Sequence, residues 1–192
     1  MTATKSTMLE LGTPAPDFDL PDPDGKRYRL ADFADADALV VAFICNHCPF
    51  VKHLRTELAA FGRDCAVKNV AMVAITANDI ESHPADAPEH MREEVQNFGY
   101  VFPYLYDESQ ATAKAYLAAC TPDFYLFDKD RRLVYRGQFD DSRPNSDVPA
   151  TGCDLRAAVD SLLAGRGPVA EQKPSIGCNI KWKAGNEPDY YG

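Results

Sequence analysis

Two uninterrupted apolar runs, with a segment of helical periodicity between them, dominate the hydrophobic pattern of this chain. Residues 38–44 and 70–76 are almost entirely hydrophobic, which is typical of strands that are buried on both faces of a sheet. Between the runs, large apolar residues recur at helical spacing, namely Phe50, Leu54, Leu58 and Phe61. Pro49 suits the first turn of that helix, because no hydrogen bond is lost there. The pattern predicts a strand–helix–strand unit with parallel strands and a right-handed crossover.

Shorter patterned segments surround this unit. Residues 14–30 place an Asp-Pro-Asp-Gly turn between extended residues and predict an N-terminal hairpin. A polar loop over residues 78–89 is long enough to flank a functional site. The other predicted elements are helices over 88–98, 110–119 and 154–163, a strand at 104–106, and a hairpin of 123–128 with 133–137.

Length and composition favour one domain with additions at both ends. The chain has 192 residues, of which 45% are hydrophobic, and this is enough for one good core. We predict an N-terminal tail over 1–10, a domain over 11–165 and a C-terminal extension over 166–192. The extension contains the single tryptophan, Trp182, which favours docking over a disordered tail.

The net charge of the chain and the composition of its N-terminal residues indicate which partners and which cellular location to expect. The formal net charge is −9 and no Lys/Arg-rich block is present, so we expect neither a nucleic-acid partner nor an anionic membrane surface. Residues 1–7 lack the apolar stretch of a signal peptide, and no segment approaches the roughly 20 apolar residues of a membrane span. The sequence predicts a cytoplasmic protein. In a reducing compartment, a close pair of cysteines is catalytic or metal-binding rather than structural.

Cys45 and Cys48 form such a pair, placed between the first buried strand and the helix that begins at Pro49. A thiol at a helix N-terminus lies among unpaired N–H groups and the positive end of the helix dipole, which favour the thiolate. We therefore expect the pKa of Cys45 to fall below the ordinary value of about 8.5, toward the lower limit of roughly 3.5 known for such sites. His47, within the pair, is expected to stabilise the same thiolate further.

Metal binding is a second interpretation of these residues. One Cys-x-x-Cys pair supplies half of a zinc or copper site, and Cys120, His47 or Cys178 would have to complete it. The spacing is not specific to a metal. We expect no organic cofactor.

Three motifs together resemble a known family. They are Gly12-Thr13-Pro14-Ala15-Pro16-Asp17-Phe18 followed by Asp24-Gly25, the run Cys45-x-x-Cys48-Pro49, and Thr121-Pro122 before a strand. This pattern is similar to the thioredoxin fold, in the branch of alkyl hydroperoxide reductases and thiol-specific antioxidant proteins, over roughly residues 11–163. The resemblance implies an α/β fold with a central mixed sheet flanked by helices, an N-terminal hairpin extension and a C-terminal tail.

The resemblance also implies a mechanism. Cys45 would attack a substrate disulfide as the nucleophile, and Cys48 would resolve the mixed disulfide. Pro122 would follow a cis peptide bond and turn the backbone of Thr121 toward the substrate strand. A His before the second cysteine resembles strongly oxidising disulfide donors, which would assign His47 to tuning. The partners would then be dithiol or disulfide proteins that bind transiently.

Peroxide reduction is the main alternative within the same resemblance. Peroxidases of this branch carry a Pro-x-x-x-Thr-x-x-Cys run, and here Cys45 stands in place of the threonine while the proline is missing. Arg143 is the candidate for the cation that would help to bind a hydroperoxide.

The remaining candidates have weaker claims. Cys65 is expected in the core, and Cys153 and Cys178 are expected to be structural, with a secondary redox role as the alternative. The histidines outside the pair, His53, His83 and His90, are expected on solvated faces. No proton acceptor is assigned, although Asp37 is the acid nearest in sequence to the first buried strand.

Overall fold

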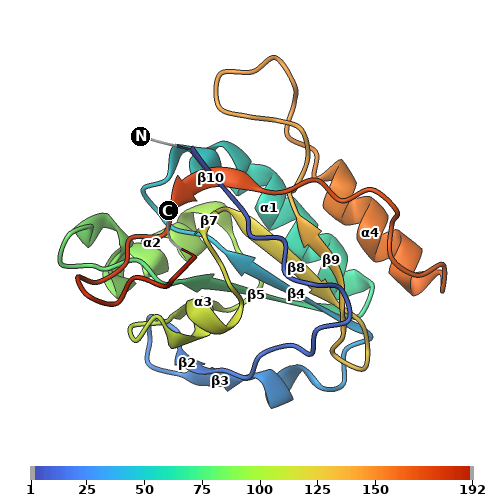
Figure 1. Ribbon diagram of the computed structural model, residues 1–192, viewed down its shortest axis with the longest axis horizontal. Coiled ribbons are helices and arrows are strands. Elements are labelled where there is room, and N and C mark those ends of the chain that lie inside the picture. The colour runs from blue at the N-terminus through green and yellow to red at the C-terminus, as the bar shows by residue number, and fades with distance from the viewer. Residues whose placement is uncertain (1–2, 191–192) are drawn as a thin grey trace.

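A five-stranded mixed sheet forms the centre of the computed structural model, which describes residues 3–190 (Figure 1). Its strands are β4 (Ala38–Phe43), β5 (Val70–Thr76), β6 (Tyr104–Tyr106), β8 (Asp123–Phe127) and β9 (Leu133–Gly137). They lie in the order β6-β5-β4-β8-β9. β4, β5 and β6 are parallel to one another, whereas β8 runs antiparallel to β4 and β9 antiparallel to β8. The predicted mixed sheet and its parallel strand–helix–strand unit are confirmed.

Both faces of this sheet are covered, which explains why the apolar runs do not alternate. Ala38, Val40 and Ala42 of β4 pack in one buried cluster with residues of three helices. These helices are α1 (Pro49–Val67), α2 (Pro88–Phe98) and α4 (Cys153–Leu163). The alternate β4 residues pack on the other face, against the hairpin β2 (Asp19–Pro21) and β3 (Arg27–Arg29), against α3 (Ala111–Ala115) and against the C-terminal segment. A side chain on either face of β4 is therefore buried.

Helix α1 begins directly after the second cysteine of the pair. Cys48 is its N-cap residue and Pro49 occupies the first turn, as the sequence predicts. Its buried face includes Val51, Leu54, Leu58 and Phe61. Fully burying each large apolar side chain of this kind contributes about 1.5–3 kcal/mol, so the helix is fixed firmly behind the thiols.

The helix predicted over 110–119 is shorter in the structure, because left-handed residues stand at both of its ends. The helix predicted over 110–119 is confined to α3, since Gln110 has φ 63° and Leu117 has φ 51°, both in the left-handed region. The chain then enters the short strand β7 (Cys120–Thr121). Two 3₁₀ turns also occur, η1 (Leu30–Phe33) and η2 (Pro84–Asp86), the second within the predicted polar loop.

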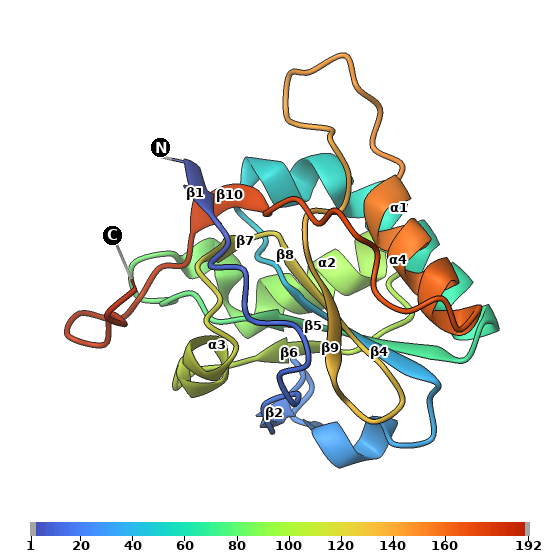
Figure 2. The ribbon, with the colours of Figure 1, turned by 45° about the vertical axis from the view of Figure 1, so that its right-hand side comes forward.

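Segments from the two ends of the chain meet in a second sheet. β1 (Ala3–Lys5), β10 (Ile176–Asn179) and β7 form a three-stranded antiparallel sheet in the order β1-β10-β7. Figure 2 shows these strands side by side above the end of the main sheet. The division into 1–10, 11–165 and 166–192 stays a prediction, and residues 1–2 and 191–192 lie outside the described part. Both flanking segments nevertheless contribute a strand to the sheet that ends at β7.

The segment after β10 is fixed to the body of the protein. The Lys181 N–H donates to Asn78 Oδ1 at 2.8 Å, and the Lys183 N–H donates to Gln110 Oε1 at 2.9 Å. Trp182 between them is only 8% exposed and belongs to the second core cluster. The predicted docking of the tryptophan is confirmed.

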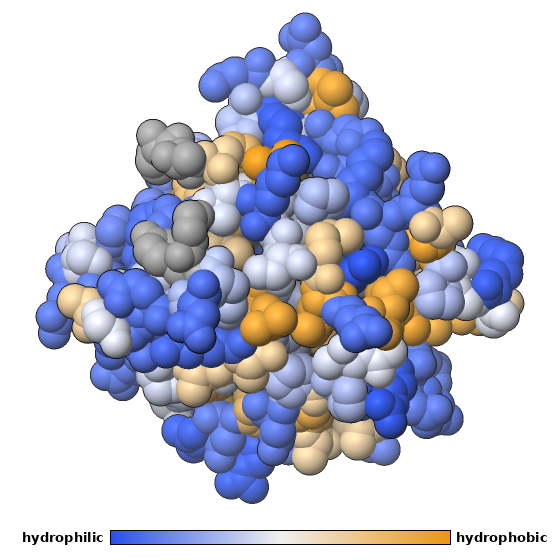
Figure 3. Space-filling model, viewed as in Figure 1, coloured by the Kyte–Doolittle hydropathy of each residue, from blue (hydrophilic) through white to orange (hydrophobic). Residues whose placement is uncertain are grey.

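The surface agrees with the acidic composition. The face drawn in Figure 3 is mostly hydrophilic, with most of its apolar atoms in patches near the middle and smaller ones above and below. Among the helices of residues 3–190, none is both long enough and apolar enough to cross a bilayer.

Gly177 in β10 should tolerate no side chain. A Cβ at this position would lie 1.9 Å from the carbonyl oxygen and 2.6 Å from the carbonyl carbon of Thr121, and backbone atoms cannot move aside. We expect Gly177→Ala to lower the free energy of unfolding in urea by about 2–4 kcal/mol. Gly185→Ala is the control: nothing lies within 4 Å of its Cβ, although its φ is +78°. The control should cost only about 1 kcal/mol, and equal losses would contradict this account of the β10–β7 approach.

Candidate redox site

The two cysteines of the pair lie where β4 ends and α1 begins, at one edge of the main sheet. Cys45 is 1% exposed and Cys48 is fully buried, so the two sulfurs differ little in exposure. Exposure therefore does not distinguish the attacking sulfur from the resolving one. No disulfide joins them.

Thr121 contacts both sulfurs and brings the three predicted residues together. Its hydroxyl lies 3.3 Å from Cys45 Sγ, and its carbonyl oxygen accepts a hydrogen bond from Cys48 Sγ at 3.2 Å. The two thiols are also hydrogen-bonded to each other. The Thr121–Pro122 peptide bond is cis, as predicted. A dithiol is thus packed against the residue that precedes a cis-proline.

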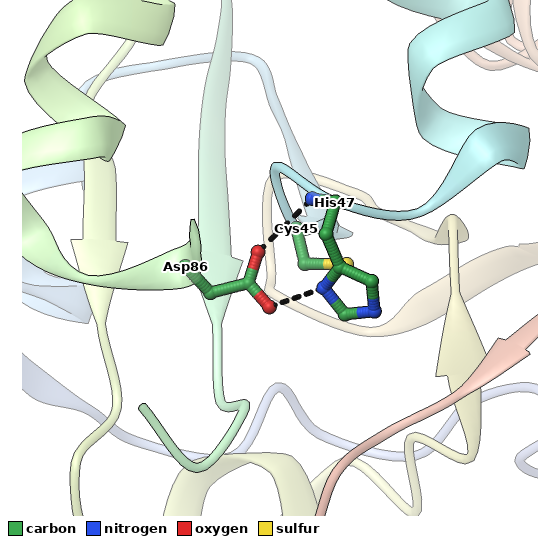
Figure 4. Close-up of side chains that lie close together, drawn as sticks. All are labelled: Cys45, His47 and Asp86. Atoms are coloured by element: carbon green, nitrogen blue, oxygen red, sulfur yellow. Dashed lines mark hydrogen bonds and ion pairs between the residues drawn. The ribbon is translucent and has the colours of Figure 1, made fainter. Parts of the chain in front are cut away.

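A buried carboxylate holds the loop between the cysteines. Asp86 is fully buried, and its Oδ1 accepts the backbone N–H groups of Asn46 at 2.7 Å and His47 at 3.1 Å. Its Oδ2 lies 2.6 Å from His47 Nδ1 and accepts the Asn78 amide at 2.8 Å (Figure 4). Although burial alone would raise the pKa of Asp86, the hydrogen bonds from His47 and Asn78 lower it. Asp86 is therefore a charged anchor for the loop.

Further bonds fix the side chain and carbonyl of Asn46. Tyr104 donates its hydroxyl to Asn46 Oδ1 at 3.1 Å, and the Asn46 amide donates to the Ala85 carbonyl at 3.0 Å. Arg55 of α1 donates to the Asn46 carbonyl at 2.8 Å and pairs with Glu94 at 2.5 Å. The loop is thus tied to α1, to β6 and to the 78–89 segment, which does flank the site.

His47 is arranged differently from its predicted role. Its Nδ1, the nitrogen paired with Asp86, is also the one nearest to Cys45 Sγ, at 3.8 Å. One nitrogen cannot serve both groups well, so the three side chains do not form a relay. The ring of His83 lies 4.9 Å from the His47 ring, so His83 belongs to the site and not to a solvated face as predicted. Burial is the first cause that lowers the pKa of His83, followed by the charge of His47.

The predicted lowering of the Cys45 pKa is wrong. Burial raises this pKa above its ordinary value, and the hydrogen bond to Cys48 and the charge of Asp86 act in the same direction. The thiolate is instead favoured at Cys48, whose pKa is lowered by hydrogen bonds from the Cys178 and Cys45 thiols and from the Val51 N–H. On ionising, Cys48 gives up the bond that its thiol donates to the Thr121 carbonyl. The reason is positional: Cys48, not Cys45, is the N-cap of α1, next to the unpaired N–H groups of its first turn.

Sequence reasoning missed Asp86, Asn78 and the position of Cys178. Asp86 lies 38 residues beyond Cys48, in a loop with several other acids, and nothing in the pattern distinguishes it from Asp79. The long polar loop after the second buried strand could have indicated these residues. The two strands are parallel, so this loop and the thiols lie at the same end of the sheet.

Other candidates lie away from the dithiol or have other partners. Asp37 precedes β4 and binds the Asn69 amide at 3.0 Å, at the end of β4 opposite to Cys45. The Arg143 guanidinium donates to the carbonyls of Asp140 and Ser142 and to Gln138. Cys65 is buried as predicted, Cys153 is exposed, and His90 pairs with Glu93 on the surface, whereas His53 is only partly exposed.

Asp123 is a buried acid that the sequence did not single out. It follows Pro122, is fully buried and accepts the Tyr125 hydroxyl at 2.9 Å. Burial raises the pKa of Asp123 to about 7. Its carboxyl group therefore changes charge near neutral pH.

Three side chains of the site have ligand atoms close enough to bind one ion. The ligand atoms of Cys45, His47 and Asp86 lie within 4.8 Å of one another. This set shares Cys45 and His47 with the predicted metal site, but it contains a carboxylate in place of further thiols. Since His47 and Asp86 are bonded to each other, metal binding would have to replace a 2.6 Å contact. Metal binding stays a prediction.

The fold and the buried dithiol define a thioredoxin-like protein. Residues 11–136 match the model of the AhpC/TSA family, and the chain belongs to that family. A comparison with curated proteins found no match.

Solved structures extend the similarity to nearly the whole chain. A hypothetical protein from Sinorhizobium meliloti 1021 is 55% identical, with a TM-score of 0.93 over 95% of this chain and 100% of that one. An uncharacterized conserved protein from Geobacillus kaustophilus is also 55% identical, with a TM-score of 0.93 over 95% of this chain and 97% of that one. A secreted Mycobacterium tuberculosis disulfide oxidoreductase, 17% identical, gives a TM-score of 0.58 over 76% of this chain and 96% of that one. This last likeness concerns the fold alone.

Removing the Asp86 carboxylate should destabilise the loop. Asp86→Ala leaves two backbone N–H groups and the Asn78 amide without their acceptor, and we expect a loss of about 2–4 kcal/mol in the free energy of unfolding. Asp86→Asn should lose less, because its amide oxygen still accepts. Urea unfolding at pH 7 measures both, with Asp79→Ala as a control in the same loop, because Asp79 is partly exposed and its carboxylate accepts from Glu81 and Ser82 next to it. If Asp86→Ala were no worse than Asp79→Ala, Asp86 would not anchor the loop.

Asp123 should make stability fall as pH rises. The unfolded carboxyl releases its proton near pH 4, but the folded one keeps it until about pH 7. Its contribution is therefore fully present below about pH 4 and lost by about pH 7, by up to about 4 kcal/mol. Relative to the wild type, Asp123→Asn should gain stability steadily over this range. Parallel stability curves from pH 4 to pH 8 would contradict the assignment.

Proposed function

We propose that the protein is a thiol–disulfide oxidoreductase whose redox centre is the Cys45–Cys48 dithiol. The observation that carries the proposal is the position of Thr121, which lies against both sulfurs and precedes a cis-proline. Two cysteines that are three positions apart and whose sulfurs meet at one residue are placed to form a disulfide. Membership of the AhpC/TSA family supports redox chemistry in general.

The reaction transfers two electrons. A thiolate of the pair attacks one sulfur of a substrate disulfide, and the other substrate sulfur leaves as a thiolate and takes up a proton. The second thiol of the pair then attacks the mixed disulfide, which releases the reduced substrate and leaves the Cys45–Cys48 disulfide. A partner dithiol returns the pair to its reduced form by the reverse steps.

The pKa directions favour Cys48 as the first attacking sulfur. The sequence prediction gave this role to Cys45 and the resolving role to Cys48. The hydrogen bonds that lower the Cys48 pKa favour its thiolate, whereas burial and Asp86 oppose a thiolate at Cys45. Because both sulfurs are buried, a partner protein must displace covering side chains to reach them, and such contacts are transient. The cytoplasmic location stays a prediction.

Peroxide reduction is a second candidate, favoured by one observation. Cys48 lies at the helix N-cap with a lowered pKa, which suits a single peroxidatic thiolate. Arg143, the proposed peroxide-binding cation, donates its hydrogen bonds to the carbonyls of its own loop and to Gln138. The dithiol therefore remains the better supported centre.

Substitution of the pair should abolish disulfide reduction. We expect Cys48→Ser to slow the reduction of insulin disulfides by dithiothreitol at least about 100-fold and Cys45→Ser at least about tenfold, because each removes one sulfur of the exchange. The buried Cys120→Ser and the exposed Cys153→Ser are controls that should stay within about twofold of the wild type. A wild-type rate in Cys48→Ser protein would contradict the proposal. The peroxidase would be favoured by two results together. The wild type would fail to reduce disulfides, and the Cys45→Ser variant would still consume peroxide.

A further inference from the structure

A third sulfur from the C-terminal extension lies against the dithiol. Cys178 of β10 is 2% exposed and shares one buried cluster with Cys45 and Cys48. Its side chain is hydrogen-bonded to that of Cys48, and its backbone N–H also donates to Cys48 Sγ. Cys48 therefore has both Cys45 and Cys178 as neighbours.

The pairing of β10 with β7 places this sulfur. Cys178 lies opposite Thr121 in the register of the two strands, and Cys48 Sγ donates to the carbonyl of the same Thr121 at 3.2 Å. Gly177 allows the close approach, because its missing Cβ leaves room for the Thr121 carbonyl. The chain itself thus supplies a strand, with a cysteine, beside the residue that was predicted to face a substrate strand.

The position of β10 is fixed on both sides. Before the strand, Ser175 and Ser6 exchange hydrogen bonds at 3.0 Å. After it, the Lys181 N–H binds Asn78 Oδ1, and the same Asn78 side chain donates to Asp86 at 2.8 Å. One asparagine therefore joins the carboxylate that holds the Cys45–Cys48 loop to the segment that carries Cys178.

The fourth buried thiol near the site is placed differently. Cys120 Sγ donates to the Pro122 carbonyl at 3.8 Å. Cys120 and Cys178 are both buried in the same small sheet, so Cys120 serves as a matched control.

We propose that Cys178 is a third redox thiol, which exchanges with the Cys45–Cys48 disulfide to give a Cys48–Cys178 disulfide. This inference rests on the proposed function. The reduced Cys48 and burial raise the pKa of Cys178, and the influence of the Cys48 thiolate ends once Cys48 is in a disulfide. The Cys178 thiol then loses its proton and attacks Cys48 Sγ; the Cys48–Cys178 bond forms and the Cys45–Cys48 bond breaks. Cys45 leaves as a thiolate and takes up the proton that Cys178 released. No electrons are gained or lost, so the exchange requires no oxidant.

The consequence is a choice of resolving thiol. A mixed disulfide on Cys48 can be resolved either by Cys45 or by Cys178. The second route releases the substrate sulfur as a thiol and leaves a disulfide between Cys48 and Cys178 of the C-terminal strand. The extension would then be part of the redox centre.

The test follows a glutathione adduct on Cys48. Protein with Cys45→Ser is treated with glutathione disulfide, the remaining thiols are alkylated, and the linkages are mapped by mass spectrometry without reduction. We expect the Cys48–glutathione adduct to be replaced by a Cys48–Cys178 disulfide, and to persist at least about tenfold longer in Cys45→Ser,Cys178→Ser protein. Cys45→Ser,Cys120→Ser protein should behave as Cys45→Ser does.

Each outcome decides one proposal. If the adduct persists equally with and without Cys178, or if Cys120→Ser prolongs it instead, Cys178 is not a redox thiol. Protein with only Cys178→Ser separates the two proposals, because it should still form the Cys45–Cys48 disulfide if the proposed function holds. The mapping in Cys45→Ser protein leaves Cys178 intact, so a folding defect of the Cys178 variants would not hide the result.

Discussion

The buried carboxylate of Asp86 is the constraint on which the site depends. A loop that carries two thiols into the interior also carries backbone N–H groups there, and these groups need an acceptor. Asp86 accepts two of them through one oxygen and joins His47 and Asn78 through the other. Without it, the Cys-x-x-Cys segment would have to stay nearer to water. The thiols can therefore be buried only because this acid is buried beside them.

The same arrangement decides where negative charge is stable. Asp86 lies on the Cys45 side of the loop and opposes a second negative charge there. Cys48 lies at the N-cap of α1, where two backbone N–H groups and two thiols donate to it. The helix N-terminus acts as the sequence argument assumed, but on the other cysteine, because α1 starts at Pro49.

The small sheet β1-β10-β7 links the ends of the chain to the centre. β7 has only two residues, yet Thr121 within it contacts both sulfurs and pairs with Cys178. The C-terminal segment also fills one face of the main sheet with Trp182. A segment that looks like an extension in the sequence is thus continuous with both the core and the site.

Most of the fold was determined by local patterns in the sequence. The elements of the mixed sheet follow from the apolar runs, the helical spacing after Pro49 and the turn residues of the hairpins. These patterns depend only on whether a side chain is buried and on which backbone conformation its residue adopts. The motifs around Cys45, Cys48 and Pro122 likewise predict which loops meet. Helix 110–119 was overestimated, since the left-handed conformations of Gln110 and Leu117 depend on tertiary contacts. Asp86, His83 and Cys178 joined the site only through long-range packing, between 38 and 133 residues from Cys45. Which thiol holds the charge was decided in the same way, because a pKa reflects the neighbours that folding provides and not the spacing of the motif.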